Sequence, residues 1–186
     1  MKFTCAELPD IVIIEPAVYR DERGWFMETF NQRKFEDGLS GLGLPVPGLF
    51  VQDNQSLSEK SVLRGLHYQL EPFAQGKLVS VCRGAAFDVA VDIRAGSPTF
   101  GRWFGMELNE ANKTMLWIPA GFAHGFLSLE DNTIFSYKTT QFYNRESERS
   151  ICWNDPDIGI QWPMENGCTL NDKDQLAPLL KKADIS

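Results

Sequence analysis

The chain has 186 residues, of which 43% are hydrophobic and 23% charged, and it carries a formal net charge of −7. This length and composition suit one globular domain with its own core. The acidic balance repels nucleic acids and anionic membranes, so we expect neither as a partner. The sequence shows no signal peptide, no membrane-spanning stretch and no zinc-like cysteine spacing, so we expect reduced thiols and a cytoplasmic location.

Strand patterns dominate most of the chain. The clearest is at residues 86–93, where Phe87, Val89 and Val91 alternate with residues suited to the opposite face of a sheet. Short strands separated by turn residues, without strand–helix–strand alternation, predict a mainly β sandwich or closed barrel. The predicted strands are 10–18, 50–53, 62–68, 77–82, 86–93, 103–108, 114–118, 124–129, 133–142 and 150–153.

Helical patterns are confined to two peripheral segments. The first is 31–38, and the second is 170–182, where Asn171 or Asp172 can cap the N-terminus and two lysines favour the C-terminal end. We see no repeat and no domain boundary. We therefore predict a single domain over residues 1–186, with a barrel core at about 50–155 and a helical tail at about 170–183.

The chain has two histidines, His67 and His124, each on a predicted strand close to glycine. Taken alone, a histidine on a strand is usually structural. The run from Pro119 to His124 resembles the later metal-binding element of metal-dependent cupins. However, Gln69 stands where the first element would need a second histidine, and a neutral amide is a poor ligand for zinc or iron. We therefore expect no metal.

Without a metal, the chemistry must proceed by proton transfer, and His67 is the natural base because imidazole titrates near neutral pH. Tyr137 is either the acid or a ring that fills the barrel mouth. Lys77 either stabilises an oxyanion or is a solvated lysine at a strand edge. Spacing alone does not select the carboxylate that would orient the ring of His67; the candidates are Asp88, Asp92, Asp172 and Asp174.

A series of ordered blocks, spanning residues 8–180, resembles the dTDP-4-dehydrorhamnose 3,5-epimerase family. So many matches in order are far more specific than one short motif. The blocks include Asp21-Glu22-Arg23-Gly24, Val51-Gln52-Asp53-Asn54, Leu63-Arg64-Gly65-Leu66-His67-Tyr68-Gln69, Gln75-Gly76-Lys77, Gly96-Ser97-Pro98-Thr99-Phe100-Gly101, Gly121-Phe122-Ala123-His124-Gly125 and Trp153-Asn154-Asp155-Pro156.

The resemblance implies a jelly-roll (cupin-like) barrel, a homodimer and no cofactor. It implies epimerisation at C3 and C5 of dTDP-4-dehydro-6-deoxy-D-glucose, a step of dTDP-rhamnose biosynthesis. His67 matches the family's base and Asp174 the carboxylate paired with it. Tyr137 matches the acid, and Lys77 matches the residue near the keto oxygen of the substrate.

The resemblance also implies a set of substrate-binding residues. Arg23 and Glu28 match residues that reach the nucleotide of the neighbouring subunit. The remaining matches are Gln52, Asp53, Asn54, Arg64, His124, Glu148 and Lys173. One departure is Gln55, where many family members carry histidine. Three other functions remain open: an epimerase of C3 or C5 alone acting on another nucleotide sugar, a non-catalytic sugar-binding barrel, and a metal-dependent cupin.

Overall fold

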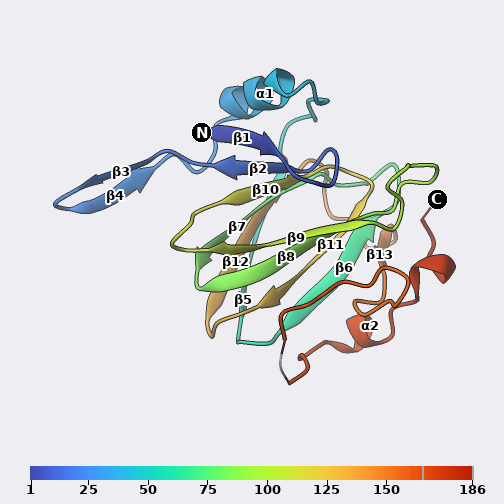
Figure 1. Ribbon diagram of the computed structural model, residues 1–186. Coiled ribbons are helices and arrows are strands. Elements are labelled where there is room, and N and C mark those ends of the chain that lie inside the picture. The colour runs from blue at the N-terminus through green and yellow to red at the C-terminus, as the bar shows by residue number, and fades with distance from the viewer. Residues whose placement is uncertain (165, 186) are drawn as a thin grey trace.

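The computed structural model describes residues 1–164 and 166–185, so positions 165 and 186 of the predicted domain lie outside the described residues. Two antiparallel sheets face each other and form the body of the molecule (Figure 1). The strands are β1 (Lys2–Cys5), β2 (Val12–Glu15), β3 (Val18–Asp21), β4 (Gly24–Met27), β5 (Gln52–Ser58), β6 (Leu63–Gln69), β7 (Lys77–Arg83), β8 (Ala85–Asp92), β9 (Trp103–Asn109), β10 (Met115–Ile118), β11 (Phe122–Ser128), β12 (Thr133–Thr139) and β13 (Glu148–Ser150).

The strand order in the larger sheet is β1-β2-β10-β7-β12-β5, and in the smaller sheet it is β13-β6-β11-β8-β9. From β5 to β13 the chain crosses between the two sheets at almost every turn, which is the arrangement of a jelly roll. The predicted mainly β fold is confirmed. A closed arrangement of this kind leaves room for a site between the sheets at the mouth of the barrel.

Apolar side chains from both sheets fill the space between them. Phe126 on β11 and Phe135 on β12 stack with their ring centroids 4.0 Å apart. Val79 and Leu116, both fully buried, pack into the same cluster. The alternation at residues 86–93 does not mark one buried and one exposed face of the strand. Val89, Val91 and Ala90 are all fully buried, so both faces of β8 are covered.

The predicted strand at 10–18 is divided in two. Val12–Glu15 joins the larger sheet as β2, whereas β3 begins at Val18 and pairs with β4 in a separate hairpin. Pro16 lies between them and lacks the N–H donor that a continuous strand needs. The β3–β4 hairpin extends away from the two sheets (Figure 1), and the sequence analysis did not predict it.

The helices are short and lie at the periphery. The predicted helix at 31–38 is present as α1 (Gln32–Gly41), with Asn31 as its N-cap. The prediction of one helix over 170–182 is wrong. The segment forms α2 (Asp172–Gln175) and the 3-10 helix η1 (Leu180–Lys182), with a turn and irregular chain between them. Pro178 interrupts the helical pattern because it lacks a donor and disfavours helical backbone at the residue before it.

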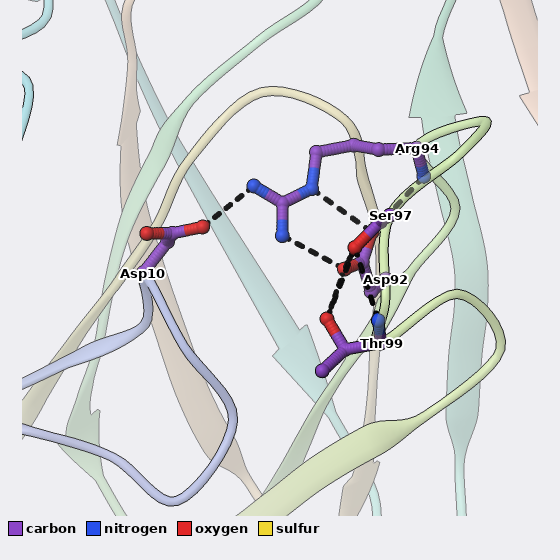
Figure 2. A network of polar contacts seen from close by, with 5 residues as sticks. All are labelled: Asp10, Asp92, Arg94, Ser97 and Thr99. Atoms are coloured by element: carbon purple, nitrogen blue, oxygen red, sulfur yellow. Dashed lines mark hydrogen bonds and ion pairs between the residues drawn. The ribbon is translucent and has the colours of Figure 1, made fainter.

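A buried polar network fixes the loop after β8 (Figure 2). The carboxylate of Asp92 is fully buried and accepts hydrogen bonds from Arg94 (Nη2, 2.7 Å), Ser97 (2.6 Å) and Thr99 (2.6 Å). Arg94 also donates to Asp10 in the loop after β1 (2.6 Å). Burial alone would raise the pKa of Asp92, but these donors outweigh it and hold the pKa well below its ordinary value. Asp92 is therefore a structural group in this fold.

Candidate active site

A cavity of about 340 Å³ opens between the two sheets. It is lined by side chains from both sheets and from the loops that follow β12 and precede α2. Most of the residues singled out from the sequence meet here. Those that line the cavity are Asn54, Arg64, His67, Lys77, His124, Tyr137 and Glu148.

His67 on β6 and His124 on β11 are direct partners in the antiparallel pair that these strands form. The two strands approach closely because glycine occupies both strands beside the histidines. A Cβ on Gly65 would lie 2.5 Å from the Cα of Gly125, and the backbone of Gly65 has a φ of +141°. Only glycine fits there. These glycines therefore bring the two imidazoles to one wall of the cavity.

His67 is paired with Asp174, which comes from α2. The distance from His67 Nε2 to Asp174 Oδ1 is 2.6 Å, and the carboxylate is buried. The second oxygen of Asp174 accepts a hydrogen bond from the backbone N–H of Gly65 (3.2 Å). A carboxylate at Nε2 fixes the proton on that nitrogen and leaves the lone pair on Nδ1. The arrangement is that of an oriented general base.

His124 has a carboxylate of its own. Its Nε2 lies 2.7 Å from Oδ1 of Asp88, and both side chains are buried. Burial lowers the pKa of His124, and the nearby Asp88 carboxylate only partly opposes this. His124 is therefore neutral at physiological pH. Asp88, one of the four carboxylates considered for His67, instead orients the second histidine.

Lys77 lies in the cavity wall and is buried. Its Nζ donates to the backbone carbonyl of His67 (3.2 Å). Burial lowers the pKa of Lys77 to about 8, and the carboxylates of Asp88 and Glu148 limit the fall. The alternative of a solvated lysine at a strand edge is wrong, because only 7% of the residue is exposed.

Tyr137 comes from β12, in the sheet opposite His67. Burial raises the pKa of its phenol above the ordinary value, so the hydroxyl keeps its proton at neutral pH. The cavity thus has a potential proton acceptor on one sheet and a potential proton donor on the other. That is the arrangement needed to remove a proton from one face of a carbon and return one to the opposite face.

Charged residues gather at one side of the cavity. Lys173 Nζ lies 2.6 Å from Glu148 Oε1, and the other oxygen of Glu148 accepts a hydrogen bond from the hydroxyl of Tyr143 (3.0 Å). Sequence reasoning missed Tyr143, which lines the cavity from the loop after β12. Its only signal in the sequence is that it forms, with Phe142, an aromatic pair in an otherwise polar loop.

Five predicted substrate-binding residues do not line the cavity: Lys173, which pairs with the lining residue Glu148, and Arg23, Glu28, Gln52 and Asp53. Arg23 is at the turn of the β3–β4 hairpin and pairs with Asp21, and Glu28 pairs with Lys34 (2.8 Å). Gln52 donates to Asn54 (2.9 Å), and Asp53 pairs with Lys138 (2.8 Å). The β3–β4 hairpin, whose turn carries Arg23, leaves the barrel (Figure 1), and Glu28 directly follows its second strand.

Gln69, at the position of the missing histidine, is turned toward backbone groups. Its amide donates to the carbonyl of Phe73 (2.6 Å) and accepts from the N–H of Asn144 (2.7 Å). Within residues 1–164 and 166–185, no three His, Cys, Asp or Glu side chains are grouped as metal ligands would be. Over the same part of the chain, no helix is long and apolar enough to cross a membrane.

A jelly-roll barrel with an oriented imidazole, a buried ammonium group and a half-buried phenol around one cavity has the groups that an acid–base isomerase of the cupin fold needs. Residues 5–182 match the family model described as dTDP-4-dehydrorhamnose 3,5-epimerase. The chain belongs to the dTDP-4-dehydrorhamnose 3,5-epimerase family, whose enzymes are isomerases of dTDP-rhamnose biosynthesis. The predicted family, cupin-like fold and class of enzyme are confirmed.

Individual relatives give the same result. The chain is 58% identical over 168 residues to the dTDP-4-dehydrorhamnose 3,5-epimerase of Shigella flexneri, covering 90% of each chain. A Legionella pneumophila 3,5-epimerase solved with dTDP-4-keto-L-rhamnose has a TM-score of 0.92 and 49% identity, covering 98% of this chain and 94% of that one. A 3'-monoepimerase from Streptomyces bikiniensis, solved with dTDP-quinovose, has a TM-score of 0.86 and 35% identity over 97% and 88%.

Proposed function

We propose that His67 is the base of this epimerase, that Asp174 orients it, and that Tyr137 is the acid. The substrate is dTDP-4-dehydro-6-deoxy-D-glucose and the product dTDP-4-dehydro-L-rhamnose. The observation that carries the assignment is the 2.6 Å contact between His67 Nε2 and Asp174 Oδ1 in the wall of the cavity. The complex of the Legionella relative with dTDP-4-keto-L-rhamnose supports the choice of substrate.

The substrate itself explains why one base suffices for two carbons. The keto group at C4 acidifies the hydrogens at C3 and C5. In a chair derived from glucose both hydrogens are axial on the same face of the ring. A single imidazole on that face therefore reaches each of them in turn, and His67 removes them through Nδ1, the nitrogen that Asp174 leaves free.

Loss of the proton places negative charge on the C4 oxygen. The ammonium group of Lys77 stabilises that oxyanion, and its burial makes the attraction stronger than it would be in water. Tyr137 then donates its proton to the carbon from the other sheet, so the centre inverts. Neutral His124, held by Asp88, binds the sugar beside them.

The cations near the cavity bind the diphosphate of the substrate, with Arg64 in the lining and Lys173 beside it.

The enzyme acts as a homodimer, in which Arg23 and Glu28 of one copy contact the nucleotide in the cavity of the other. The β3–β4 hairpin supports this, because Tyr19, Trp25 and Phe26 are all more than half exposed on it. Sedimentation of the purified chain tests this, and a monomer under assay conditions would contradict it.

Turnover of the substrate in D₂O, followed by NMR, tests the reaction. Deuterium at both C3 and C5 with a rhamnose-type product supports it. Exchange at one carbon alone would place the chain with monofunctional enzymes such as its Streptomyces relative. Absence of exchange with tight binding would indicate a sugar-binding barrel, and activity that required a stoichiometric metal would indicate a metal-dependent cupin.

A further inference from the structure

The proposed reaction assigns no role to the segment Trp153-Asn154-Asp155-Pro156, although its aspartate is only 2% exposed. Both carboxylate oxygens of Asp155 accept hydrogen bonds from backbone N–H groups. Oδ1 accepts from Asp157 in the same turn (2.9 Å), and Oδ2 accepts from Leu180 (2.6 Å). The second bond joins the barrel to a part of the chain 25 residues further on.

Leu180 belongs to the C-terminal strap, which we define as residues 170–185. After α2, hydrogen bonds join the strap to the barrel at Pro178, Leu180 and Asp184. The N–H of Cys152 donates to the carbonyl of Pro178 (2.8 Å), Asp155 accepts from Leu180, and Arg149 donates to Asp184 (2.9 Å). The side chain of Leu180 is also buried in a core cluster of the barrel.

Apart from the bonds that Asp174 makes to His67 and Gly65 and the ion pair of Lys173 with Glu148, the α2 helix has few contacts that would hold it against the barrel. It spans four residues, and Asp174 is the one that is buried. The next residue after the helix, Leu176, is 83% exposed. The position of Asp174 therefore depends on where the chain is fixed on either side of α2, upstream by the backbone of Thr169 and downstream at Pro178 and Leu180.

We propose that Asp155 is a positioning residue for the reaction: by holding the backbone of Leu180, it keeps the strap in place and thereby holds the carboxylate of Asp174 against His67. This rests on the proposed role of His67. The 2.6 Å contact tolerates little displacement, since a misplacement of about 1 Å at a catalytic group can cost roughly 100-fold in rate.

The chemistry of Asp155 makes it sensitive to a small substitution. Both of its oxygens face N–H donors, and asparagine has one oxygen and one NH₂ group in their place. Asp155→Asn therefore leaves one N–H without an acceptor and opposes it with a second donor. We expect the strap to detach around Leu180 while the barrel stays folded, with kcat falling roughly tenfold, as for other partners that orient a reacting group.

The test uses ¹⁵N NMR of the imidazoles in the full-length enzyme, because the chain has only two histidines. In the parent protein we expect the proton of His67 on Nε2, beside Asp174, and the lone pair on Nδ1. In Asp155→Asn we expect intermediate shifts, which report a mixture of tautomers. His124 is the internal reference, because its partner Asp88 lies on β8 and not on the strap. Loss of stability alone does not mix the tautomers of one histidine.

Two further variants complete the design. Asp157→Asn is the matched control: it makes the same change in the same turn, but its side chain is 64% exposed and makes only a 3.6 Å ion pair to Lys181. We expect the control to keep parental kcat and a single tautomer. Adding Asp155→Asn to Asp174→Asn should cost little further activity, because the effect of Asp155 passes through Asp174.

The proposal is overturned if folded Asp155→Asn keeps one His67 tautomer and parental kcat, or if it slows the Asp174→Asn enzyme as much as it slows the parent. If Asp155→Asn does not fold, Leu180→Ala takes its place, because it removes the apolar anchor of the same strap. Either of the two results just given, found with Leu180→Ala, then overturns the proposal. Failure of the proposed function would give a different result. His67→Asn would then keep its activity, whichever tautomers His67 adopts in the other variants.

Discussion

His67 and His124 lie directly opposite each other on β6 and β11, yet each imidazole is bound by a different carboxylate. Asp174 reaches His67 from the C-terminal strap, whereas Asp88 reaches His124 from the neighbouring strand β8. His67 is partly exposed to the cavity, and His124 is buried and neutral. Two residues of the same type, paired directly across neighbouring strands, thus have different chemistry.

Substitution of each histidine in turn should separate their roles. His67→Ala removes the base, and we expect kcat to fall by about 10³–10⁴-fold, near the upper range for general base catalysis. His124→Gln keeps a hydrogen-bonding group and should raise KM more than it lowers kcat. Steady-state kinetics measure both, with circular dichroism as a check of folding. A His67→Ala enzyme with substantial activity would show that the base is elsewhere.

Tyr137→Phe separates removal of the proton from its return. The variant keeps His67 and Lys77, so carbanion formation continues, but the donor on the opposite sheet is lost. In D₂O we expect deuterium to enter the substrate at C5 faster than the inverted product forms, with net turnover reduced by about 10²-fold or more. Equal losses of exchange and inversion would argue against Tyr137 as the acid.

Titration of Lys77 should make activity and stability change in opposite directions as the pH becomes alkaline. In the proposed mechanism its charged form stabilises the oxyanion, so kcat/KM should fall as the pH rises through about 8. Because the pKa of Lys77 is 10.5 in its ordinary state and about 8 when folded, the unfolded chain binds more protons between these values. The free energy of unfolding contributed by this group therefore rises with pH over the same range.

The Lys77→Met variant is the control for both measurements. It should have little activity at any pH and should lack the alkaline gain in stability. Rate profiles and denaturant unfolding from pH 7 to 10.5 compare the two proteins. An alkaline fall of kcat/KM in the residual activity of Lys77→Met at the same pH would assign the titration to another group.

The network around Asp92 should be a main source of stability (Figure 2). Asp92→Asn removes one partner from a buried ion pair, and we expect it to cost about 3 kcal/mol in the free energy of unfolding. Since the folded pKa of Asp92 is depressed, its contribution is present above its ordinary pKa of 3.8 and is lost as pH falls below it. Denaturant unfolding should show a smaller acid loss in Asp92→Asn, with kcat nearly unchanged.

Strand alternation and ordered motifs are local features, so the sequence predicted the mainly β fold and several residues that the structure brings to one cavity. It did not predict a break at Pro178, because the capping residue Asn171 and the lysines at 181–182 suggested one continuous helix. It also missed the β3–β4 hairpin, whose exposed residues have no buried face to impose alternation.

The pairing of the carboxylates was beyond sequence reasoning for a different reason. Asp174 and His67 are separated by 107 positions in the sequence, and Asp88 and His124 by 36. Only the packing of the sheets and the path of the strap decide which acid faces which ring. The resemblance to the family supplied the first pairing, whereas the second came only from the structure.

The order of elements along the chain has a consequence for biosynthesis. The last barrel strand, β13, ends at Ser150, and Asp174 follows it in the strap. On the ribosome the barrel strands therefore emerge before the carboxylate that orients His67. A nascent chain can gather its sheets while it is still tethered, but the imidazole acquires its partner only when the exit tunnel releases the strap. Activity should accordingly appear only after all the barrel strands and the strap have emerged.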